Sequence, residues 1–364
     1  MRDRPAQARF VSGLGLAEAV DALDPHATSA VTAGPWWRAW IDTLPSARGL
    51  LVERDGAPVA LLPLATPGGL RPWLEPLGAS ALGEPVGALA ADPAALADLA
   101  HGLAAKRVPL SLPRIPSDDP LVAALRAAHR PPQLVRVRPT SGAPVIDLRG
   151  LSQATDLFGR SSRQTFGKKL RRAEKLAELS YEVHEPAPGE VDALVAEVIA
   201  VESRSWKRDS DKALASNATL RAFFHAYARH AARAGVLRIA VMRIGGTPAA
   251  VQLSAESHAA LNQLRIGYDD QFARVSPGQL LMLHMVDWAL GRGLERYEIL
   301  GKEEAWNRQW KAEPRPLLRV MTFPPGARSL AALGVRLGEA AGYRLRSYRR
   351  PSEADSGESS ASVT

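Results

Sequence analysis

The sequence predicts an α/β (α+β) protein of two tandem domains, each a mixed, mostly antiparallel sheet flanked by helices. The second half shows strand and helix patterns in the order β, α, α, β, β, β, α, β, α, β, and the first half shows a fainter copy. Three consecutive strands followed by a crossover helix give a mixed sheet with helices on both faces. With 364 residues, of which 46% are hydrophobic, the chain is long enough for two such cores.

Alternating and helical periodicities locate the elements of the second half. Thr219 is expected to cap a helix that Gly235 stops, and Gly245-Gly246 predicts a hairpin between two strands. Strands are predicted at 179–184, 236–244, 248–257, 261–269, 297–300 and 317–323. Helices are predicted at 190–206, 219–234 and 277–292, and a Trp-rich, helix-like stretch lies between the last two strands.

The first half repeats this order less clearly. Strands are predicted at 49–53, 58–65, 109–115, 133–138 and 145–148, and helices at 92–106 and 119–129. Gly56-Ala-Pro-Val-Ala60 and Gly246-Thr-Pro-Ala-Ala250 occupy the same place in two hairpins, although Gly-x-Pro is common turn chemistry. The shared order of elements is the stronger sign of a duplication.

Four segments follow from this organisation. We expect a degenerate N-terminal domain over residues 1–150 and a C-terminal domain over 151–325, with 139–144 as a linker. A basic helix is expected over 326–350, and it could lie on an anionic membrane surface, bind an acidic partner or pack across the domains. The polar tail, 351–364, is expected to be disordered.

The net charge of +8 suits an anionic partner such as a nucleotide, a phosphorylated cofactor, RNA or a membrane surface, or else serves solubility alone. The chain has no cysteine, which excludes disulfides and thiol nucleophiles, and its eight histidines show no metal-ligand spacing, so no metal is expected. There is neither a secretory signal pattern nor an apolar run of about 20 residues. We therefore expect a cytoplasmic protein without a transmembrane segment.

Two segments carry candidate anion-binding chemistry. Pro277 opens a helix, Ser276 is expected to cap it, and Gly278 lets a ligand approach the free N–H groups at the positive end of the helix dipole. A plain helix start is the alternative. Seven cations crowd residues 160–175 above an apolar stripe, and they predict either contacts to phosphates or a solvated helix face.

Four patches carry a resemblance to a known family. They are Ser161-Ser-Arg-Gln-Thr-Phe-Gly-Lys-Lys-Leu-Arg-Arg172, Glu202-Ser-Arg-Ser-Trp-Lys207, Gly267-Tyr-Asp-Asp-Gln-Phe-Ala-Arg-Val-Ser-Pro-Gly-Gln-Leu-Leu281 and Gly301-Lys-Glu-Glu-Ala-Trp-Asn-Arg-Gln-Trp310. In this order, they make residues 158–323 resemble the GNAT superfamily. More narrowly, that region is similar to the BioF2-like or CelD-type (cellulose biosynthesis) acetyltransferases, which are related to the FemAB-like tandem-GNAT proteins.

The resemblance implies acyl transfer from acetyl-CoA or another acyl-CoA to an amine or hydroxyl. It places the pyrophosphate of coenzyme A at Arg274, Val275, Ser276, Pro277, Gly278 and Gln279. It also implies contacts to substrate from Arg163, Lys168, Arg172, Trp206, Lys207, Lys302 and Trp310.

Proton transfer in such a reaction needs a base for the acceptor and an acid for the leaving thiolate. Asp269 is the first candidate base, followed by Glu202 and Glu303, and Tyr268 is the candidate acid. A surface carboxylate or a helix cap is the alternative for each acid, and a half-buried structural tyrosine for Tyr268. Trp306-Asn307 stands where family members often carry Tyr-Lys, and Lys302, Arg308 or Lys311 are candidate substitutes.

The sequence thus predicts an acyl-CoA-dependent N- or O-acyltransferase. By the resemblance, the acceptor is a small molecule or a glycan precursor, such as one of a cell-surface polysaccharide. The segment from Leu82 to Ala90 lacks a phosphate-loop pattern, so the first domain is expected to shape the acceptor site. Two alternatives stay open: a FemAB-like transferase that uses aminoacyl-tRNA, and a non-catalytic scaffold of a biosynthetic assembly.

Overall fold

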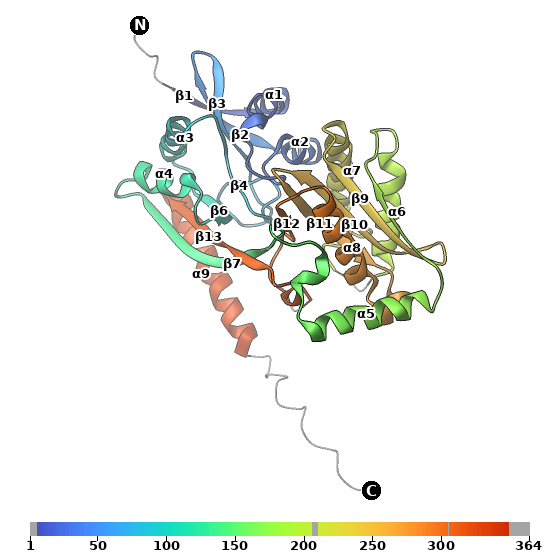
Figure 1. Ribbon diagram of the computed structural model, residues 1–364. Helices are drawn as coiled ribbons and strands as arrows, with labels where there is room; N and C mark the ends of the chain where they lie inside the picture. The colour runs from blue at the N-terminus through green and yellow to red at the C-terminus, as the bar shows by residue number, and fades with distance from the viewer. Residues whose placement is uncertain (1–5, 206–209, 305, 349–364) are drawn as a thin grey trace.

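The computed structural model describes residues 6–205, 210–304 and 306–348, with side chains described up to residue 339. Two sheets and nine labelled α-helices make up this part of the chain (Figure 1). One sheet has the order β1-β2-β3-β4, with β5 also paired to β3, and the other has the order β6-β13-β7-β12-β11-β10-β9-β8. The architecture is therefore the predicted one, mixed sheets flanked by helices.

The elements of the first half are short. Its strands are β1 (Gln7–Ser12), β2 (Arg48–Arg54), β3 (Ala57–Ala65), β4 (Glu75–Pro76), β5 (Leu89–Ala90), β6 (Leu110–Pro116) and β7 (Leu134–Asp147). Its helices are α1 (Gly13–Leu23), α2 (Gly34–Thr43), α3 (Pro93–Ala105) and α4 (Pro120–Ala128). The sequence patterns did not predict β1, α1, α2, β4 or β5.

The second half follows its predicted order closely. Its strands are β8 (Leu179–His184), β9 (Leu237–Ile244), β10 (Thr247–Ser257), β11 (Ala260–Tyr268), β12 (Arg296–Glu298) and β13 (Glu313–Phe323). Its helices are α5 (Arg160–Glu174), α6 (Val191–Ser203), α7 (Ala218–Arg233), α8 (Pro277–Gly291) and α9 (Ala327–Tyr348). The expected cap of α7 is wrong, because Asn217 accepts the hydrogen bond from Leu220 N at 2.9 Å. Gly235 does end α7, with φ of +70°.

The two halves arrange their strands in the same spatial order. From one edge, the first half runs β1-β2-β3-β4, and a parallel bridge from Leu74 to Leu110 continues it to β6 and β13. From the opposite edge, the second half runs β8-β9-β10-β11-β12 and then β7. In each half two helices follow the first strand: α1 and α2 follow β1, and α6 and α7 follow β8. One helix then precedes the strand that joins in parallel, α3 before β6 and α8 before β12. This correspondence supports the duplication better than the five-residue echo between the hairpins.

The halves also exchange strands. β7 lies between β12 and β13, while β13, from the end of the second half, lies between β6 and β7. The expected linker at 139–144 is wrong, because these residues belong to β7 and pair with β13. One sheet thus holds strands from both sides of residue 150, and the domain boundaries stay predictions.

Helices α2 and α7 join the halves through an aromatic cluster. The ring of Trp40 stacks on Phe223 at 4.0 Å, and Trp36 meets Phe223 and Tyr227 edge-on. Trp36, Trp37 and Trp40 are all buried. Core packing at the junction of the halves therefore explains this tryptophan cluster.

Candidate active site

A cavity of about 660 Å³ opens where β11 and β12 separate. The two strands pair in parallel over three positions, from Ala260 and Arg296 to Asn262 and Glu298. Beyond this point they diverge, and the cavity is lined by β11 from Gln263 to Tyr268 on one side and by Ile299 to Lys302 on the other. The divergence of the two parallel strands therefore opens a space between them that a ligand can enter.

A bulge occurs in β11 where this divergence begins. Gln263 is paired with Ser254 and Arg265 with Leu253, so Leu264 is an extra residue between two consecutive partners on β10. A bulge bends its strand and redirects side chains, and it is frequent beside functional sites. Gln263, Leu264 and Arg265 all line the cavity.

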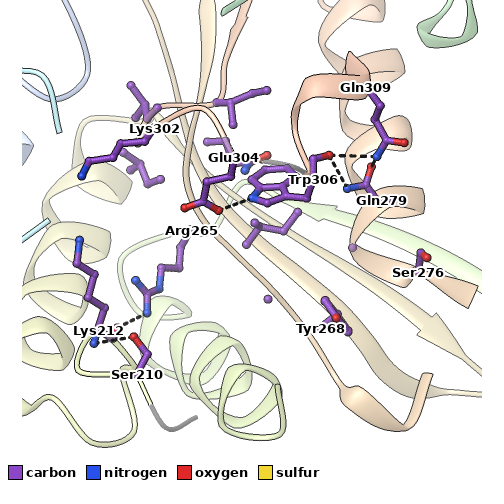
Figure 2. A pocket seen from close by; sticks show the side chains of 18 of the residues that line it. Ser210, Lys212, Arg265, Tyr268, Ser276, Gln279, Lys302, Glu304, Trp306 and Gln309 are labelled. Atoms are coloured by element: carbon purple, nitrogen blue, oxygen red, sulfur yellow. Dashed lines mark hydrogen bonds between the residues drawn. The ribbon is translucent and has the colours of Figure 1, made fainter. Parts of the chain in front are cut away.

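The start of α8 forms one end of the cavity. Ser276, Gly278 and Gln279, three of the residues predicted for the donor loop, line it (Figure 2). Ser276 adopts the left-handed conformation with φ of +54°, and its side chain does not cap α8, contrary to the expected cap. Its carbonyl oxygen accepts from Gln279 N and Leu280 N, and the N–H of Gly278 has no acceptor among the described residues. The helix start therefore offers one free donor toward the cavity.

The other predicted donor-loop residues lie outside the cavity lining. Val275 and Pro277 are buried, and Val275 belongs to the core beneath the loop. Arg274 is exposed and is not among the cavity-lining residues. Gln279 connects α8 to the segment after β12, because its side-chain oxygen accepts from Gln309 Nε2 at 2.7 Å and from Trp310 Nε1 at 2.9 Å.

The chain leaves β12 in a strained turn that the first half of the chain holds. Leu300 and Gly301 both have positive φ, +56° and +62°, and a left-handed residue other than glycine costs of order 1 kcal/mol. Glu84 accepts a hydrogen bond from Gly301 N at 2.9 Å, and the guanidinium of Arg114 donates to Gly301 O. Arg114 also donates to Gly83 O at 2.6 Å, so one arginine holds together the two segments that contain Gly83 and Gly301.

Glu84 is a cavity carboxylate that the sequence patterns did not reveal. Its Oε2 accepts from Gly301 N, and its Oε1 has no hydrogen-bond partner among the described residues. Burial raises the pKa of the Glu84 carboxyl, although the hydrogen bond from Gly301 and the charges of Arg114, Lys212 and Arg265 oppose this. An oriented carboxylate with a raised pKa is suited to proton transfer.

The first candidate base, Asp269, lies behind the cavity wall. It is 3% exposed, is not among the cavity-lining residues and accepts from Gln271 N at 3.0 Å, so it caps the 3₁₀ helix Asp270–Val275. Arg204 Nε donates to its other oxygen. Burial raises the pKa of this carboxyl, but the hydrogen bonds from Arg204 and Gln271 outweigh it and hold the pKa below its ordinary value. The geometry favours a capping role over proton transfer.

Glu202 and Glu303 also form ion pairs, which give each carboxylate a structural role. Glu202 is 1% exposed, and its carboxylate pairs with Arg265 and accepts from Leu214 N at 3.3 Å. Glu303 is exposed and pairs with Arg308 at 2.8 Å. Neither residue lines the cavity, so the geometry favours structural roles for both.

Tyr268 does line the cavity, opposite the start of α8. A Cβ added to Gly278 would lie 3.4 Å from its ring, so glycine permits the close contact. Burial, and then the charge of Asp270, raise the pKa of the Tyr268 hydroxyl. The hydroxyl therefore stays protonated at neutral pH, as an acid toward a thiolate must.

Asn307, in place of the family lysine, is buried and holds its own loop. Its amide nitrogen donates to Lys302 O at 3.0 Å, and its oxygen accepts from Glu304 N at 3.0 Å. Among the three candidate substitutes, Lys302 lines the cavity, whereas Arg308 and Lys311 do not. Figure 2 shows the indole of Trp306, which donates to Glu304 at 2.7 Å, between Arg265 and Gln279.

Trp310 does not occupy the substrate position predicted for it. It is fully buried, lies against Phe158 and Phe166, and donates to Gln279. The tryptophan thus anchors α5 and the start of α8 to the core, because its ring packs against one and its N–H bonds the other.

The basic helix α5 sends one cation into the cavity. Lys169 lines it and lies 5.4 Å from the centre of the Phe166 ring, and burial lowers the pKa of its ammonium group. Arg163, Lys168 and Arg172, the predicted contacts, are exposed and do not line the cavity. Trp206 and Lys207 lie outside the described residues.

The cavity walls carry a positive balance of charge. Lys169, Lys212, Arg265 and Lys302 line the cavity together with the acids Glu84 and Glu304. Figure 2 shows Lys212, Arg265 and Lys302 grouped on the side away from Ser276 and Gln279. Cations in a cleft attract anionic ligands.

Comparison with known proteins agrees with this geometry. A family model of the acetyltransferase (GNAT) domain matches residues 160–311, which supply most of the cavity lining. Residues 160–311 therefore match a GNAT acetyltransferase domain, and the fold of the chain is of the GNAT type. No match was found among curated proteins.

Solved structures resemble the chain over most of its length. The C-terminal domain of a putative lysylphosphatidylglycerol synthetase from Agrobacterium fabrum covers 88% of this chain and 95% of its own, with a TM-score of 0.59 and 13% identity. The L-PGS of Bacillus licheniformis covers 88% and 96%, with a TM-score of 0.58 and 13% identity. FemX covers 88% and 97%, with a TM-score of 0.53 and 11% identity. At such identities the likeness concerns the fold alone.

Proposed function

We propose that the protein is an acyl-CoA-dependent acyltransferase that acylates an amine or a hydroxyl. The observation that carries the proposal is the cavity between the diverging strands β11 and β12, which ends at the open start of α8. A thioester arm can extend along β11 while the phosphates of its carrier lie at the helix start.

The donor would occupy the side of the cavity near α8. The N–H of Gly278 and the positive end of the α8 dipole would meet its diphosphate, and Ser276 and Gln279 would border it. Lys169 is the lysine of α5 that reaches the cavity, and it would add a charge. Arg274 is expected to contribute little, since it is exposed and outside the lining.

The acceptor would enter beside Glu84. An amine acceptor arrives as an ammonium ion and gives a proton to Oε1 of Glu84, and its nitrogen then forms a bond to the thioester carbonyl carbon. The C–S bond breaks, the nitrogen gives up its second proton, and the thiolate takes a proton from the Tyr268 hydroxyl or from solvent. The proton released by the nitrogen restores the Tyr268 hydroxyl or passes to solvent. The role of Glu84 as the base is supported by two observations: the Gly301 N–H orients its carboxylate, and the pKa of the Glu84 carboxyl is raised. General base catalysis contributes typically 10²–10⁴-fold.

The first half of the chain would thus shape the acceptor site, since it supplies Leu82 and Glu84 to the cavity. An acceptor from a cell-surface polysaccharide or its precursor is supported by the CelD-type resemblance alone. Lys212 and Lys302, on the same side of the cavity, favour an acceptor with an anionic group.

Aminoacyl transfer from tRNA is the second candidate function. The exposed cations of α5, Arg163, Lys168 and Arg172, favour it, because RNA binding depends on phosphate neutralisation. FemX and the lysylphosphatidylglycerol synthetases, whose folds resemble this chain, are in keeping with it. A scaffold without activity is less favoured, because it would need no oriented carboxylate in the cavity.

Thermal unfolding with CoA, acetyl-CoA and longer acyl-CoAs tests the donor site. A ligand that binds the folded state alone stabilises it by about 2.7 kcal/mol at a hundredfold excess over its dissociation constant. Gly278→Glu should abolish the rise in midpoint, because it puts a carboxylate at the phosphate site. Gly291→Glu, at the exposed end of the same helix, is the matched control and should keep it.

Failure of every CoA ester at millimolar concentration would contradict the proposal. Binding of tRNA that weakens steeply with salt would then support the second candidate. Binding of neither ligand would leave the scaffold as the remaining interpretation.

A further inference from the structure

Helix α9 has one face packed on the protein and one face exposed. Ala332 is buried and Val335 partly buried against Trp73, Met321 and Phe323. Next to them, the Arg336 guanidinium lies 5.2 Å from the centre of the Trp73 ring and pairs with Glu339 at 2.6 Å. These contacts fix the rotation of the helix about its axis.

The exposed face carries a stripe of leucines. Leu330, Leu333 and Leu337 are spaced by three and four residues, which places them on one side of the helix. They are 73%, 39% and 63% exposed, and they account for three of the seven large hydrophobic residues exposed in the described chain. Figure 1 shows the last turns of α9 extending beyond the sheets. A clustered apolar stripe at the surface indicates an interaction site, whereas single exposed leucines do not.

The charge of the same helix decides between possible partners. α9 contains four arginines, Arg328, Arg336, Arg344 and Arg346, and one acid, Glu339, which is paired. Arg349 and Arg350 follow in the sequence. A second copy of this chain would bring two such basic helices together, which electrostatic repulsion opposes. An anionic surface satisfies both the charge and the apolar stripe.

We infer that α9 docks on an anionic lipid membrane, with its leucine stripe between the headgroups and its arginines beside lipid phosphates. An amphipathic helix with an apolar face and a basic composition lies in the plane of the membrane interface. Anionic lipids attract each nearby arginine with an energy equal to about a fivefold gain in affinity. The attraction falls with ionic strength. Docking concerns α9 alone and does not depend on the reaction in the cavity.

Co-sedimentation of the full chain with vesicles tests the inference. Vesicles of phosphatidylcholine with a third phosphatidylglycerol should bind the protein at 0.1 M salt, and pure phosphatidylcholine vesicles should not. Leu330→Gln/Leu337→Gln should weaken binding on the order of tenfold, since two partly buried leucines are lost from the interface. Leu14→Gln/Leu176→Gln removes leucines that are 82% and 58% exposed elsewhere, and it should leave binding unchanged.

A second pair of variants tests the charge. Arg344→Gln/Arg346→Gln should weaken binding about 25-fold, at about fivefold per arginine. Arg171→Gln/Arg172→Gln, on the other basic helix, should not. Three results would overturn the inference: an equal loss of vesicle binding in the two double-arginine variants, binding to neutral vesicles, and no binding to any vesicle. So would a dimer in light scattering that Leu330→Gln/Leu337→Gln dissociates, because the stripe would then belong to a second copy.

Discussion

The buried pair of Glu202 and Arg265 offers a quantitative test of the roles that the structure assigns. Glu202→Gln keeps the volume of the side chain and an oxygen for the Leu214 N–H, and it removes the charge that Arg265 faces. The side chains of Glu202 and Arg265 are 2% and 11% exposed. The substitution therefore leaves a nearly buried guanidinium without its counter-ion.

Loss of one partner from a buried ion pair costs about 3–5 kcal/mol. Because Arg265 also donates to Lys212 O and keeps that contact, we expect Glu202→Gln to lie near the lower end, about 3 kcal/mol. Glu202→Gln/Arg265→Met removes both charges and should recover most of this loss, since replacement of a whole buried pair is often close to neutral.

Urea unfolding followed by tryptophan fluorescence measures these differences. Glu303→Gln is the matched control, because its partner Arg308 is 67% exposed and surface ion pairs contribute about 0–1 kcal/mol. A destabilisation by Glu202→Gln below about 1 kcal/mol, equal to the control, would refute the assignment of Glu202 to the fold. It would restore Glu202 as a candidate base.

Three further outcomes follow from the same structure. Asn307→Ala should cost about 1–3 kcal/mol in urea unfolding, since Lys302 O and Glu304 N lose their buried partner; an effect near zero would refute the loop-holding role. Asp269→Asn should destabilise the protein at neutral pH, because the lowered pKa of Asp269 stabilises the fold while its carboxylate is ionised. The difference should shrink as the pH falls from the ordinary carboxyl pKa of 3.8 through the lowered pKa, and a difference that stays constant in acid would contradict this. The raised pKa of Glu84 acts in the opposite direction. Wild type should lose stability relative to Glu84→Gln as the pH rises above 4.5 and through the raised pKa, which thermal unfolding at a series of pH values measures. A pH-independent difference would exclude burial as the cause of a raised Glu84 pKa.

Local patterns predicted much of the second half and the helix start that borders the cavity. Strand alternation located β8 to β11, and the helix start at Pro277 with Gly278 after it indicated a ligand site. Both features depend on residues that are neighbours in sequence. Hydrophobic periodicity and turn-forming residues act between such neighbours, so a single sequence reveals them.

The side of the cavity that Glu84 lines depends on contacts that no local pattern encodes. Glu84 follows a glycine in an irregular segment, and its contact with Gly301 spans 217 positions. Arg114 reaches the same turn from β6, which β13 joins to the second half. The linker was misjudged for the same reason, since Pro139 and Pro144 are typical of a loop but pair with β13 at the junction of the halves.

Asp269 and Glu202 were ranked as bases by position in the family patches, but their partners lie elsewhere in the chain. Arg204 pairs with Asp269 across 65 positions, and Arg265 with Glu202 across 63. A carboxylate in a family patch is equally compatible with proton transfer and with a buried ion pair. Only the fold distinguishes them, because it shows which oxygens face a cavity.

A crystal structure of the acetyl-CoA complex tests the central claim most directly. We predict the diphosphate at the N–H of Gly278, the thioester between β11 and Leu300, and Oε1 of Glu84 within about 7 Å of the thioester carbonyl carbon. That distance is the sum of a hydrogen bond of about 3 Å and an attack distance of about 3.5 Å for an intervening acceptor atom. A donor bound outside the cavity, or a thioester that Glu84 cannot approach through one acceptor atom, would contradict the account.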